Sequence, residues 1–545
     1  MPILAKEYIP IATKDILSWI YDDLAYDQDT PIYIDANAPS HSISAAQAKT
    51  LIRKLVAGLQ HEGIRPGDTV LAHSFNNLYY PILVLGIIAC GGRFCGTNAS
   101  YTTGELKHAL ASSQTKLIIC DPDVLGDHII TATRATGISS SQILALDSAA
   151  TPSTGEIKGF RSWRTLLDHG ETDWVRFDDE TTSRNTTAGL FFSSGTTGLP
   201  KATQLSHYNF IAEHVLAYES RPRAYEIRRL VALPMFHIAT APTTHISALK
   251  AGHVQAIMRR YEPSTYLTMI KKYNITDLTL VPPQVTSLLA LALPAHDKSA
   301  KLASVRCVWG GGAPLDASTQ ARFQSLLPTS APFTQIWAMT ETTCFASLFD
   351  YPETDTTGSV GRFLPNIDVK LLDDAGNDIT APDAPGELAI RGPTVTRGYV
   401  GVPQERDFDA EGYFRTGDIM RFDDRTGLWY ILDRKKDLIK VRGFQVAPAE
   451  VEGVLLAHPG VGDAAVIGVG SADGSSEMPR AYVVKKSGVE LDEEGVKSWV
   501  GERLAKYKWL EGGIVFVEGL PKTASGKIIK RELRERAKIE LGAKL

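Results

Sequence analysis

The sequence predicts an α/β protein, with a large amino-terminal domain followed by a small carboxy-terminal α+β domain. From the start to about residue 433, short β-like runs such as Leu117–Cys120 and Leu278–Val281 alternate with amphipathic segments of helix length. This alternation is typical of sheets covered by helices. Between about residues 360 and 432 the sequence pattern changes to short strands separated by Gly and Pro turns. After residue 433 the pattern changes again, to mixed helices and strands.

The chain of 545 residues is too long for one hydrophobic core, and about 150 residues per unit gives roughly three to four compact units. We expect a large domain over residues 1–432, with two α/β lobes over about 1–359 and a β-barrel-like subdomain over about 360–432. The small α+β domain is expected over residues 433–545. Residues 139–154, rich in Ser, Thr and Ala, are expected to form an exposed connection inside the large domain.

The composition argues against several classes of function. Apolar residues make up 43% and charged residues 22%, and the formal charge of −5 is spread over a long chain, so no nucleic-acid or membrane-surface partner is indicated. The five cysteines are widely spaced and lack the clustering of metal sites, which fits a reducing compartment.

Two further features bear on targeting. Lys6 and Glu7 interrupt the apolar stretch that a signal peptide needs. The longest apolar run, Pro81–Ala89, is about half of the roughly 20 residues needed to cross a bilayer, so it is expected to be a buried helix or strand.

The most informative segment is LFFSSGTTGLPK, residues Leu190–Lys201, in which a strand-like end runs into hydroxyls, two glycines and a lysine. Glycines permit the positive φ that lets several N–H groups converge, and Lys201 adds a mobile cation. GxxxxGK[ST] is absent, so this is not a Walker A loop. The segment favours a phosphate-binding loop, although taken alone it leaves open a solvated Gly/Ser/Thr loop.

Further segments follow in a fixed order: LPMFH (Leu233–His237), QIWAMTE (Gln335–Glu341), YFRTGD (Tyr413–Asp418), DRKKDLIKVRGFQVAPAEVE (Asp433–Glu452) and PKTASGK (Pro521–Lys527). Together with the glycine loop they resemble the superfamily of AMP-forming adenylating enzymes, which contains acyl- and aryl-CoA synthetases, 4-coumarate-CoA ligases, luciferases and peptide-synthetase adenylation domains. The resemblance covers nearly the whole chain, and its wording is most similar to the 4-coumarate-CoA ligase-like branch. It implies an ATP-dependent acid-CoA ligase that forms an acyl-adenylate and then an acyl-CoA, releasing pyrophosphate and AMP.

The resemblance also implies a nucleotide site. Glu341 would face phosphate and Mg²⁺. One glutamate is enough for this, because Mg²⁺ usually binds few protein carboxylates and keeps several waters. Trp337 would stack on adenine. Asp418 would accept hydrogen bonds from the ribose. Ile336 and Ala338 replace glycines that are common in the motif, and are expected to narrow the pocket. The implied ATP- and AMP-binding residues are Ser193, Ser194, Gly195, Thr196, Thr197, Gly198, Lys201, Gly312, Ala313, Pro314, Gln335, Ile336, Trp337, Ala338, Met339, Thr340, Asp418, Arg434 and Lys527.

For catalysis, the resemblance gives Lys527 the role of bridging the carboxylate and the α-phosphate. The other catalytic residues that it implies are Lys201, Thr340, Glu341 and His237. A lone lysine or histidine would ordinarily be a solvated or a packed residue. His237 would gate an acyl tunnel. The expected acid pocket, suited to an uncharged tail, consists of His237, Ile238, Thr240, Trp309 and Gly311.

The two half-reactions need different groups at one place, so we expect the small α+β carboxy-terminal domain to be mobile and to rotate between them. By resemblance Lys436 is the hinge. Coenzyme A would be bound by residues of LIKVRGFQV, namely Lys440, Arg442, Gly443 and Gln445.

The sequence ends in Ala543, Lys544 and Leu545, which is similar to the SKL address of peroxisomes. We therefore expect binding to the peroxisomal import receptor and a peroxisomal location in a eukaryote, and otherwise a cytoplasmic one. Three alternative functions remain open: an acyl-AMP ligase that loads a carrier protein, a luciferase-like oxidation of the adenylate, and a catalytically inactive binding module. The acid itself is not specified by the motifs.

Overall fold

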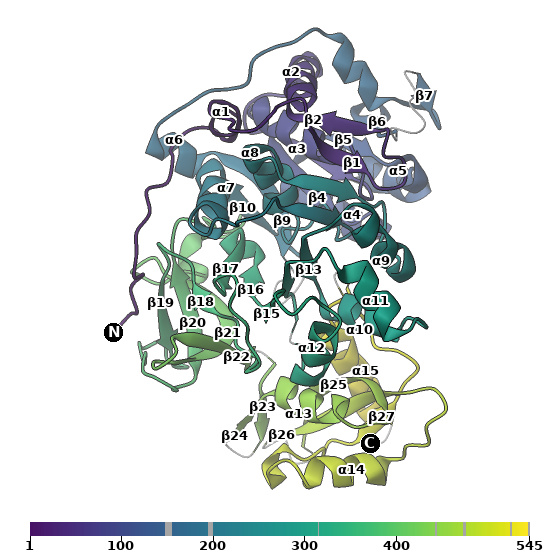
Figure 1. The fold of residues 1–545 in the computed structure, drawn as a ribbon, viewed down its shortest axis with the longest axis vertical. Coiled ribbons are helices and arrows are strands. Elements are labelled where there is room, and N and C mark those ends of the chain that lie inside the picture. Colours follow the sequence, from purple (N-terminus) through teal and green to yellow (C-terminus); the bar gives the residue numbers. More distant parts are fainter. Residues whose placement is uncertain are drawn as a thin grey trace.

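The computed structural model describes residues 1–147, 155–193, 200–313, 315–435, 437–441, 444–471, 476–523 and 526–542, with only the backbone described for Lys440, Phe444 and Gln445 (Figure 1). Several predicted residues lie outside this part of the chain: Ser194, Gly195, Thr196, Thr197, Gly198, Pro314, Lys436, Arg442, Gly443, Ala543, Lys544 and Leu545.

The first lobe is built on a six-stranded sheet in the order β10-β9-β4-β3-β5-β6. Its strands are β3 (Thr69–His73), β4 (Arg93–Thr97), β5 (Thr115–Cys120), β6 (Ile143–Ala145), β9 (Thr187–Ser193) and β10 (Lys201–Ser206). All neighbours are parallel except β9 and β10. The buried strand β6 corrects the expectation of an exposed connection at 139–154, because Ile143, Leu144 and Ala145 are apolar enough to join the sheet.

The second lobe is built on a seven-stranded sheet in the order β15-β14-β13-β11-β12-β1-β2. Its strands are β1 (Pro31–Asp35), β2 (Ser42–Ser44), β11 (Arg228–Val231), β12 (Val254–Ile257), β13 (Asp277–Leu280), β14 (Cys307–Gly310) and β15 (Phe333–Gln335). Only the β1–β2 pair is antiparallel. The carboxyl ends of the other strands therefore share one edge of the sheet, which is where α/β proteins bind ligands.

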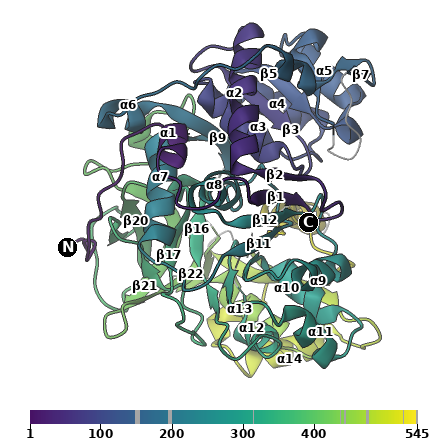
Figure 2. The same cartoon turned by 45° about the horizontal axis from the view of Figure 1, so that its top comes forward.

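Helices cover both sheets. The main ones are α2 (Ala45–His61), α3 (Tyr80–Ala89), α4 (Thr103–Ser113), α5 (Asp127–Ala135), α7 (His207–His214), α9 (Pro263–Lys272), α10 (Pro282–Ala290), α11 (Ala295–Leu302) and α12 (Ala317–Gln324). Every residue of α3 is buried and the helix packs against α2 (Figure 2), so the apolar run at Pro81–Ala89 is confirmed as a core helix. No helix in the described ranges is both long and apolar enough to cross a membrane.

Two smaller antiparallel sheets follow. The first contains β16 (Trp337–Met339), β17 (Cys344–Leu348) and β18 (Arg362–Phe363); the second contains β19 (Asp368–Leu372), β20 (Gly386–Arg391), β21 (Phe414–Asp423) and β22 (Leu428–Arg434). The second sheet corresponds to the expected β-rich subdomain, and the described strand pairings leave it open between β19 and β22. Asp418 lies within β21 rather than at a strand end, because Gly417 adopts a φ of +71° and the strand continues past it.

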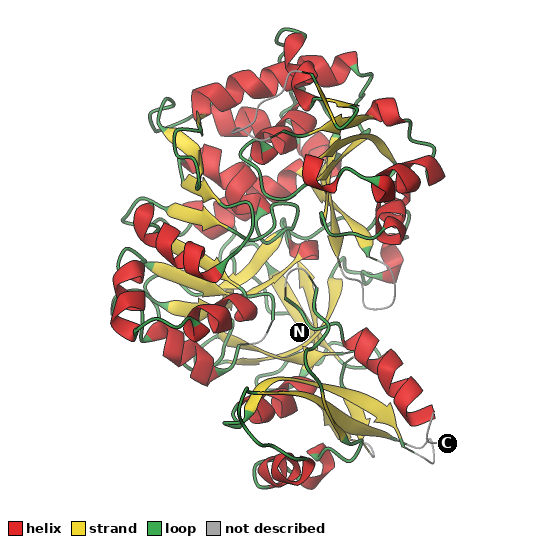
Figure 3. Cartoon of the chain, turned by 90° about the vertical axis from the view of Figure 1, so that its right-hand side faces the viewer, coloured by secondary structure: helices red, strands yellow, loops and turns green. Residues whose placement is uncertain are grey.

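The small domain has a core of its own, formed by buried residues such as Val451, Val466 and Val483. Its elements are β23 (Ile439–Val441), β24 (Phe444–Val446), β25 (Val461–Gly470), β26 (Glu477–Lys485), β27 (Ile514–Phe516), α13 (Pro448–Leu456), α14 (Glu493–Gly501) and α15 (Lys530–Gly542). Figure 3 shows this domain as a separate body at one end of the large domain. A domain with a separate core can turn as a unit.

Candidate active site

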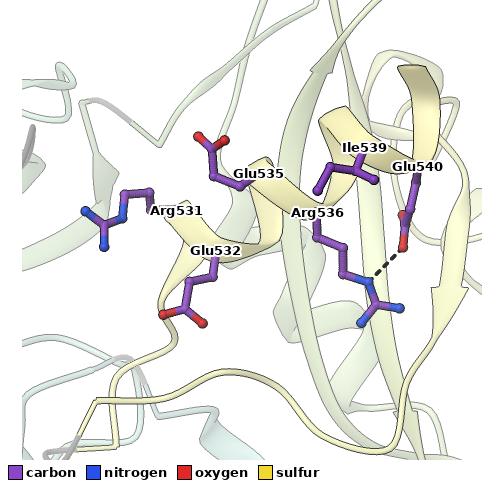
Figure 4. Close-up of a pocket in the computed structure, with 6 residues that line it drawn as sticks. All are labelled: Arg531, Glu532, Glu535, Arg536, Ile539 and Glu540. Carbon is purple, nitrogen blue, oxygen red and sulfur yellow. Dashed lines mark hydrogen bonds and ion pairs between the residues drawn. The ribbon is translucent and has the colours of Figure 1, made fainter. Parts of the chain in front are cut away.

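One cavity of about 310 Å³ lies between the two domains and receives residues from both. The predicted residues that line it are Ser193, Lys201, His237, Ile238, Gly311, Gly312, Ile336, Ala338, Met339, Thr340, Glu341, Arg434 and Lys527. A hollow along α15 differs in character: its charged groups pair along the helix itself, as Arg536 does with Glu540 at 2.7 Å (Figure 4). Pairing of this kind is that of a solvated helix surface.

The chain topology places the large-domain residues at the cavity. Gly311 and Gly312 follow the carboxyl end of β14, and Gly312 has a φ of +87°, which favours glycine. Ser193 ends β9 and Lys201 begins β10, and the two residues are antiparallel partners. This pair fixes both ends of the glycine loop, of which residues 194–199 lie outside the described part of the chain.

Lys527 reaches the cavity from the small domain. Its backbone N–H donates to Thr523 Oγ1 at 3.1 Å, and its carbonyl accepts from the Thr523 N–H at 2.8 Å. A Cβ built on Gly312 would lie 4.0 Å from Lys527 Cε. Burial, and then the positive charge of Arg434, lower the pKa of the Lys527 ammonium, while Asp418 and Glu341 act in the opposite direction. A lysine whose charge is destabilised in this way gains most when an anion enters the cavity.

Glu341 is buried and belongs to the short helical turn Thr340–Thr342, which follows β16. The Tyr399 hydroxyl donates to Glu341 Oε1 at 2.7 Å. The Lys201 ammonium lies 4.2 Å from the centroid of the Tyr399 ring and 3.6 Å from Asp407 Oδ1. Burial, and then the negative charge of Glu341, raise the pKa of Tyr399, so its hydroxyl keeps the proton that it donates.

Tyr399 and Asp407 were not predicted from the sequence. Tyr399 follows Gly398 in a segment without strong periodicity, and a single aromatic residue there is weak evidence of a site. Its role becomes visible only when the fold brings it beside Glu341.

Asp418 is buried, and its carboxylate interacts with two neighbouring side chains. Arg434 Nε lies 2.6 Å from Asp418 Oδ1, and Trp337 Nε1 donates to Asp418 Oδ2 at 2.9 Å. The Asp418 carboxylate raises the pKa of Arg434 further. Both Asp418 oxygens are therefore fixed in position at the edge of the cavity, beside its lining residues Thr416 and Gly417.

The stacking of Trp337 on adenine stays a prediction. Trp337 is 3% exposed and packs edge-on against Phe363 at 5.8 Å between ring centroids. Its neighbours Ile336, Ala338 and Met339 line the cavity. Through its hydrogen bond to Asp418, Trp337 helps to position that carboxylate.

His237 lines the cavity, as a residue of the predicted acid pocket would. Its Nδ1 accepts from the Ala239 N–H at 3.1 Å, so in the neutral ring the proton is on Nε2. Burial, and then the charge of Lys527, lower the pKa of His237 to about 4. His237 is therefore neutral near pH 7 and presents an N–H donor.

Four predicted residues lie behind the described cavity lining. Gln335 is buried, and its side-chain amide bonds to Leu315 and Gln320. Trp309 packs against Phe345, a lining residue, at 5.0 Å between ring centroids, and Thr240 is buried at 4% exposure. Ala313, like these three residues, is not part of the wall. The backbones of Lys440 and Gln445 pair between β23 and β24.

Comparisons with known proteins agree with this geometry. Residues 22–400 match the AMP-binding enzyme family, and residues 450–527 match the AMP-binding enzyme C-terminal domain. The chain is 50% identical over 531 residues to the phenylacetyl-CoA ligase epaB of Aspergillus niger, which covers 97% of this chain and 98% of that protein. ATP-bound MatB from Rhodopseudomonas palustris is 26% identical with a TM-score of 0.83, and apo MatB has a TM-score of 0.73; each comparison covers 96% of this chain and 99% of MatB.

The fold and the site therefore define an enzyme that activates a carboxylic acid with ATP. The chain belongs to the AMP-binding enzyme family, and the similarity predicted from the motifs is confirmed. It is an AMP-forming acyl-CoA ligase, which converts an acid to an acyl-adenylate and then to a coenzyme A thioester.

Proposed function

We propose that the chain joins a small, uncharged aryl or aralkyl acid of the phenylacetate kind to coenzyme A, and that the inter-domain cavity is where the acyl-adenylate forms. The observation that carries the proposal is that Lys527 of the small domain and Ser193, Lys201 and Glu341 of the large domain line one cavity. Adenylation brings a carboxylate against a triphosphate, so converging cations and fixed donors are its main requirement.

The two lysines have separate tasks in this proposal. Lys527 draws together the acid carboxylate and the α-phosphate, and its charge opposes the negative charge that builds on oxygen during the attack. Lys201 and the Ser193 hydroxyl hold the outgoing pyrophosphate. Lys201 already lies 3.6 Å from Asp407, which keeps its ammonium directed toward the cavity rim.

Mg²⁺ fits the same residues. Mg²⁺ prefers oxygen ligands and usually keeps several waters, so one carboxylate beside a triphosphate is sufficient. Glu341 supplies a buried carboxylate whose Oε1 is oriented by Tyr399. No cluster of three or more His, Cys, Asp or Glu side chains that would bind a metal unaided occurs in the described ranges. When bound, the ion would neutralise phosphate charge, and the chain would contribute Glu341.

The acid side of the cavity is mainly apolar. Ile336, Phe345 and Ile238 form its wall, and a Cβ on Gly311 would lie only 2.8 Å from Ile336 Cγ1. An apolar wall of this kind disfavours a charged tail, because it offers the charge no partner. The 50% identity to a phenylacetyl-CoA ligase also supports a small, uncharged aryl or aralkyl acid as substrate. His237, neutral with its proton on Nε2, serves as donor and gate beside this wall.

The second half-reaction requires the small domain to turn. The higher TM-score to ATP-bound than to apo MatB supports an adenylation-like arrangement for the pose observed here. Rotation about Lys436 would withdraw Lys527 and bring the segment that contains Lys440, Arg442, Gly443 and Gln445 to the thiol.

The test is a panel of carboxylic acids in a pyrophosphate-exchange assay, followed by coenzyme A capture. Phenylacetate and close aryl analogues should support both steps, whereas long-chain acids and dicarboxylates should fail already at exchange. Capture by a phosphopantetheinylated carrier instead of coenzyme A would favour the carrier-loading alternative. Oxygen uptake with light emission would favour luciferase-like chemistry.

Peroxisomal location is proposed separately. A fluorescent fusion that keeps Ala543, Lys544 and Leu545 at its end should enter peroxisomes of a eukaryotic host. A fusion lacking these residues should stay in the cytoplasm, and identical distributions of both fusions would contradict the proposal.

A further inference from the structure

Two arginines line the active-site cavity without a task in the adenylation described above: Arg406 and Arg415. Arg406 ends the short helical turn Gln404–Arg406, Arg415 lies in β21, and both are exposed. The two are held close together, because the Arg415 N–H donates to the carbonyl of Asp407, the residue after Arg406, at 2.9 Å. Both belong to the large domain, so they stay beside the cavity when the small domain turns.

Neither arginine has an acidic partner. No Asp or Glu oxygen of the described residues lies within 4.0 Å of the guanidinium nitrogens of Arg406 or Arg415. Asp407 lies beside them in the chain, but its Oδ1 is 3.6 Å from the Lys201 ammonium. Glu387, which also lines the cavity, lies 3.0 Å from Lys435. Two unpaired guanidinium groups therefore stand where the cavity meets the solvent, and their planar forks suit the oxygens of a phosphate.

The positive groups follow a gradient of exposure. Ser193 is buried, Lys201 and Asp407 are half-buried, and the two arginines are exposed. A polyanion that leaves Lys201 would otherwise pass directly from a fixed cation into water, and it would leave the ammonium unpaired. Asp407 is close enough to restore the charge balance of Lys201, and the arginines offer the anion its next contact.

We propose that Arg406 and Arg415 form an exit site for pyrophosphate. Once the bond between the α- and β-phosphates has broken, pyrophosphate moves outward from Lys201 to the two arginines, and Lys201 pairs again with Asp407. ATP stays at the inner position, because its outer phosphates are still tethered to the α-phosphate beside Lys527. The inference rests on the proposed function, in which Lys201 and Ser193 hold the outgoing pyrophosphate first.

The experiment measures the dissociation constants of pyrophosphate, ATP and coenzyme A separately, by calorimetry with Mg²⁺, for wild type, Arg406→Ala and Arg415→Ala. An exposed charge pair is worth about 5-fold in affinity, so each variant should bind pyrophosphate about 5-fold more weakly. The affinities for ATP and coenzyme A should stay within about 2-fold of wild type. Equal weakening for ATP and pyrophosphate, an effect confined to coenzyme A, or no change for pyrophosphate would overturn the proposal.

Asp407→Asn gives a result of the opposite sign. The carboxylate repels pyrophosphate and competes with it for Lys201, so its neutralisation should tighten pyrophosphate binding about 5-fold. Weaker binding in this variant would contradict the return of Lys201 to Asp407. The matched control is Arg421→Ala, on the same strand β21, because Arg421 is paired with Asp383 at 2.9 Å and lies outside the described cavity lining. It should bind pyrophosphate as wild type does.

Acid-dependent pyrophosphate exchange by wild type tests the ligase assignment separately. Exchange in wild type together with unchanged pyrophosphate affinity in both arginine variants would overturn the exit site alone. Absence of exchange with every acid would instead count against the proposed function.

Discussion

The two halves of the active site are held in different ways. On the large domain, Glu341 and Asp418 are buried and bonded to other residues of that domain, Tyr399 and Trp337. Lys527, by contrast, sits in a turn whose backbone hydrogen bonds run to Thr523 of the same loop. The large domain thus presents a fixed surface, whereas the backbone hydrogen bonds that shape the lysine turn lie within its own loop. A site assembled in this way can be dismantled by moving one domain without disturbing the other half.

The largest expected effect comes from removing the movable charge. Lys527→Ala should slow adenylation by about 100-fold or more, because a preorganised charge at the reacting phosphate is lost. Thioester formation from supplied acyl-AMP should remain near the wild-type rate. Lys522→Ala, which breaks an ion pair with Asp463 on the small-domain surface, is the matched control. Equal losses in both half-reactions would contradict this difference between the halves.

On the large domain, Tyr399→Phe removes the hydroxyl that donates to Glu341 but keeps the aromatic ring beside Lys201. The substitution should slow adenylation by about 10-fold, because a hydrogen bond to a carboxylate is worth roughly 1.5–3 kcal/mol and water replaces it only in part. Stopped-flow or pyrophosphate-exchange kinetics measure the decrease in the adenylation rate. Tyr430→Phe, which removes an exposed hydroxyl near Thr357, should have no effect, and similar rates for both variants would show that Glu341 needs no orienting partner.

The rigidity of the large domain can be tested at Glu213, which is fully buried and accepts from the Phe345 N–H at 2.9 Å behind the acid wall. Burial raises the pKa of Glu213 well above its usual value. The unfolded chain releases this proton above about pH 4.5 while the folded chain keeps it, so the residue destabilises the fold increasingly as pH rises. Glu213→Gln should therefore raise the free energy of unfolding by about 1 kcal/mol or more at pH 7.5.

Denaturant titrations at two pH values measure this difference. The stabilisation should largely disappear below about pH 4, where Glu213 is mostly protonated in both states. If Glu213→Gln raised the free energy of unfolding equally at both pH values, the Glu213 carboxyl would be ionised in the folded protein.

The smallest expected effect concerns the contact between the domains. Asp433 lies in β22, within a sheet of the large domain, so the structure begins the small domain after this strand. Asp433 Oδ2 accepts from the Ala449 N–H of the small domain at 3.1 Å, and burial raises the pKa of Asp433 to about 6. If rotation exposes Asp433 to water, its pKa should return toward about 4. The observed pose should then lose relative population as pH rises from about 4 to about 6, and stay constant above that range.

A donor–acceptor fluorophore pair, one on each domain, measures this population. Asp433→Asn should abolish the dependence between pH 4 and pH 6. A dependence that persists in the variant would assign the titration to another group.

Much of the site could be predicted from the sequence because its residues lie in short motifs that also determine local backbone shape. Lys201, His237, Glu341 and Lys527 were found in this way, and they line one cavity. The motif does not reveal how a side chain is packed: Trp337 is buried against Phe363 and bonded to Asp418, while its neighbours Ile336, Ala338 and Met339 line the cavity.

Residues without a motif were missed for a different reason. Tyr399 acts through a long-range neighbour, Glu341, and no local pattern encodes such a contact. The prediction of an exposed connection at 139–154 was wrong for a related reason. The three apolar residues of β6 stand within a polar stretch and are too few to indicate a strand.

In the arrangement proposed here, lysines of two domains surround one nucleotide. The most direct test is to react the protein with an amine-specific acylating reagent, with and without ATP and Mg²⁺, and to measure the modification of each lysine by mass spectrometry. We expect ATP to protect both Lys201 and Lys527, while the exposed Lys522, five residues from Lys527 on the same loop, should react equally in both conditions. Protection of Lys201 alone, with Lys527 as reactive as before, would contradict it.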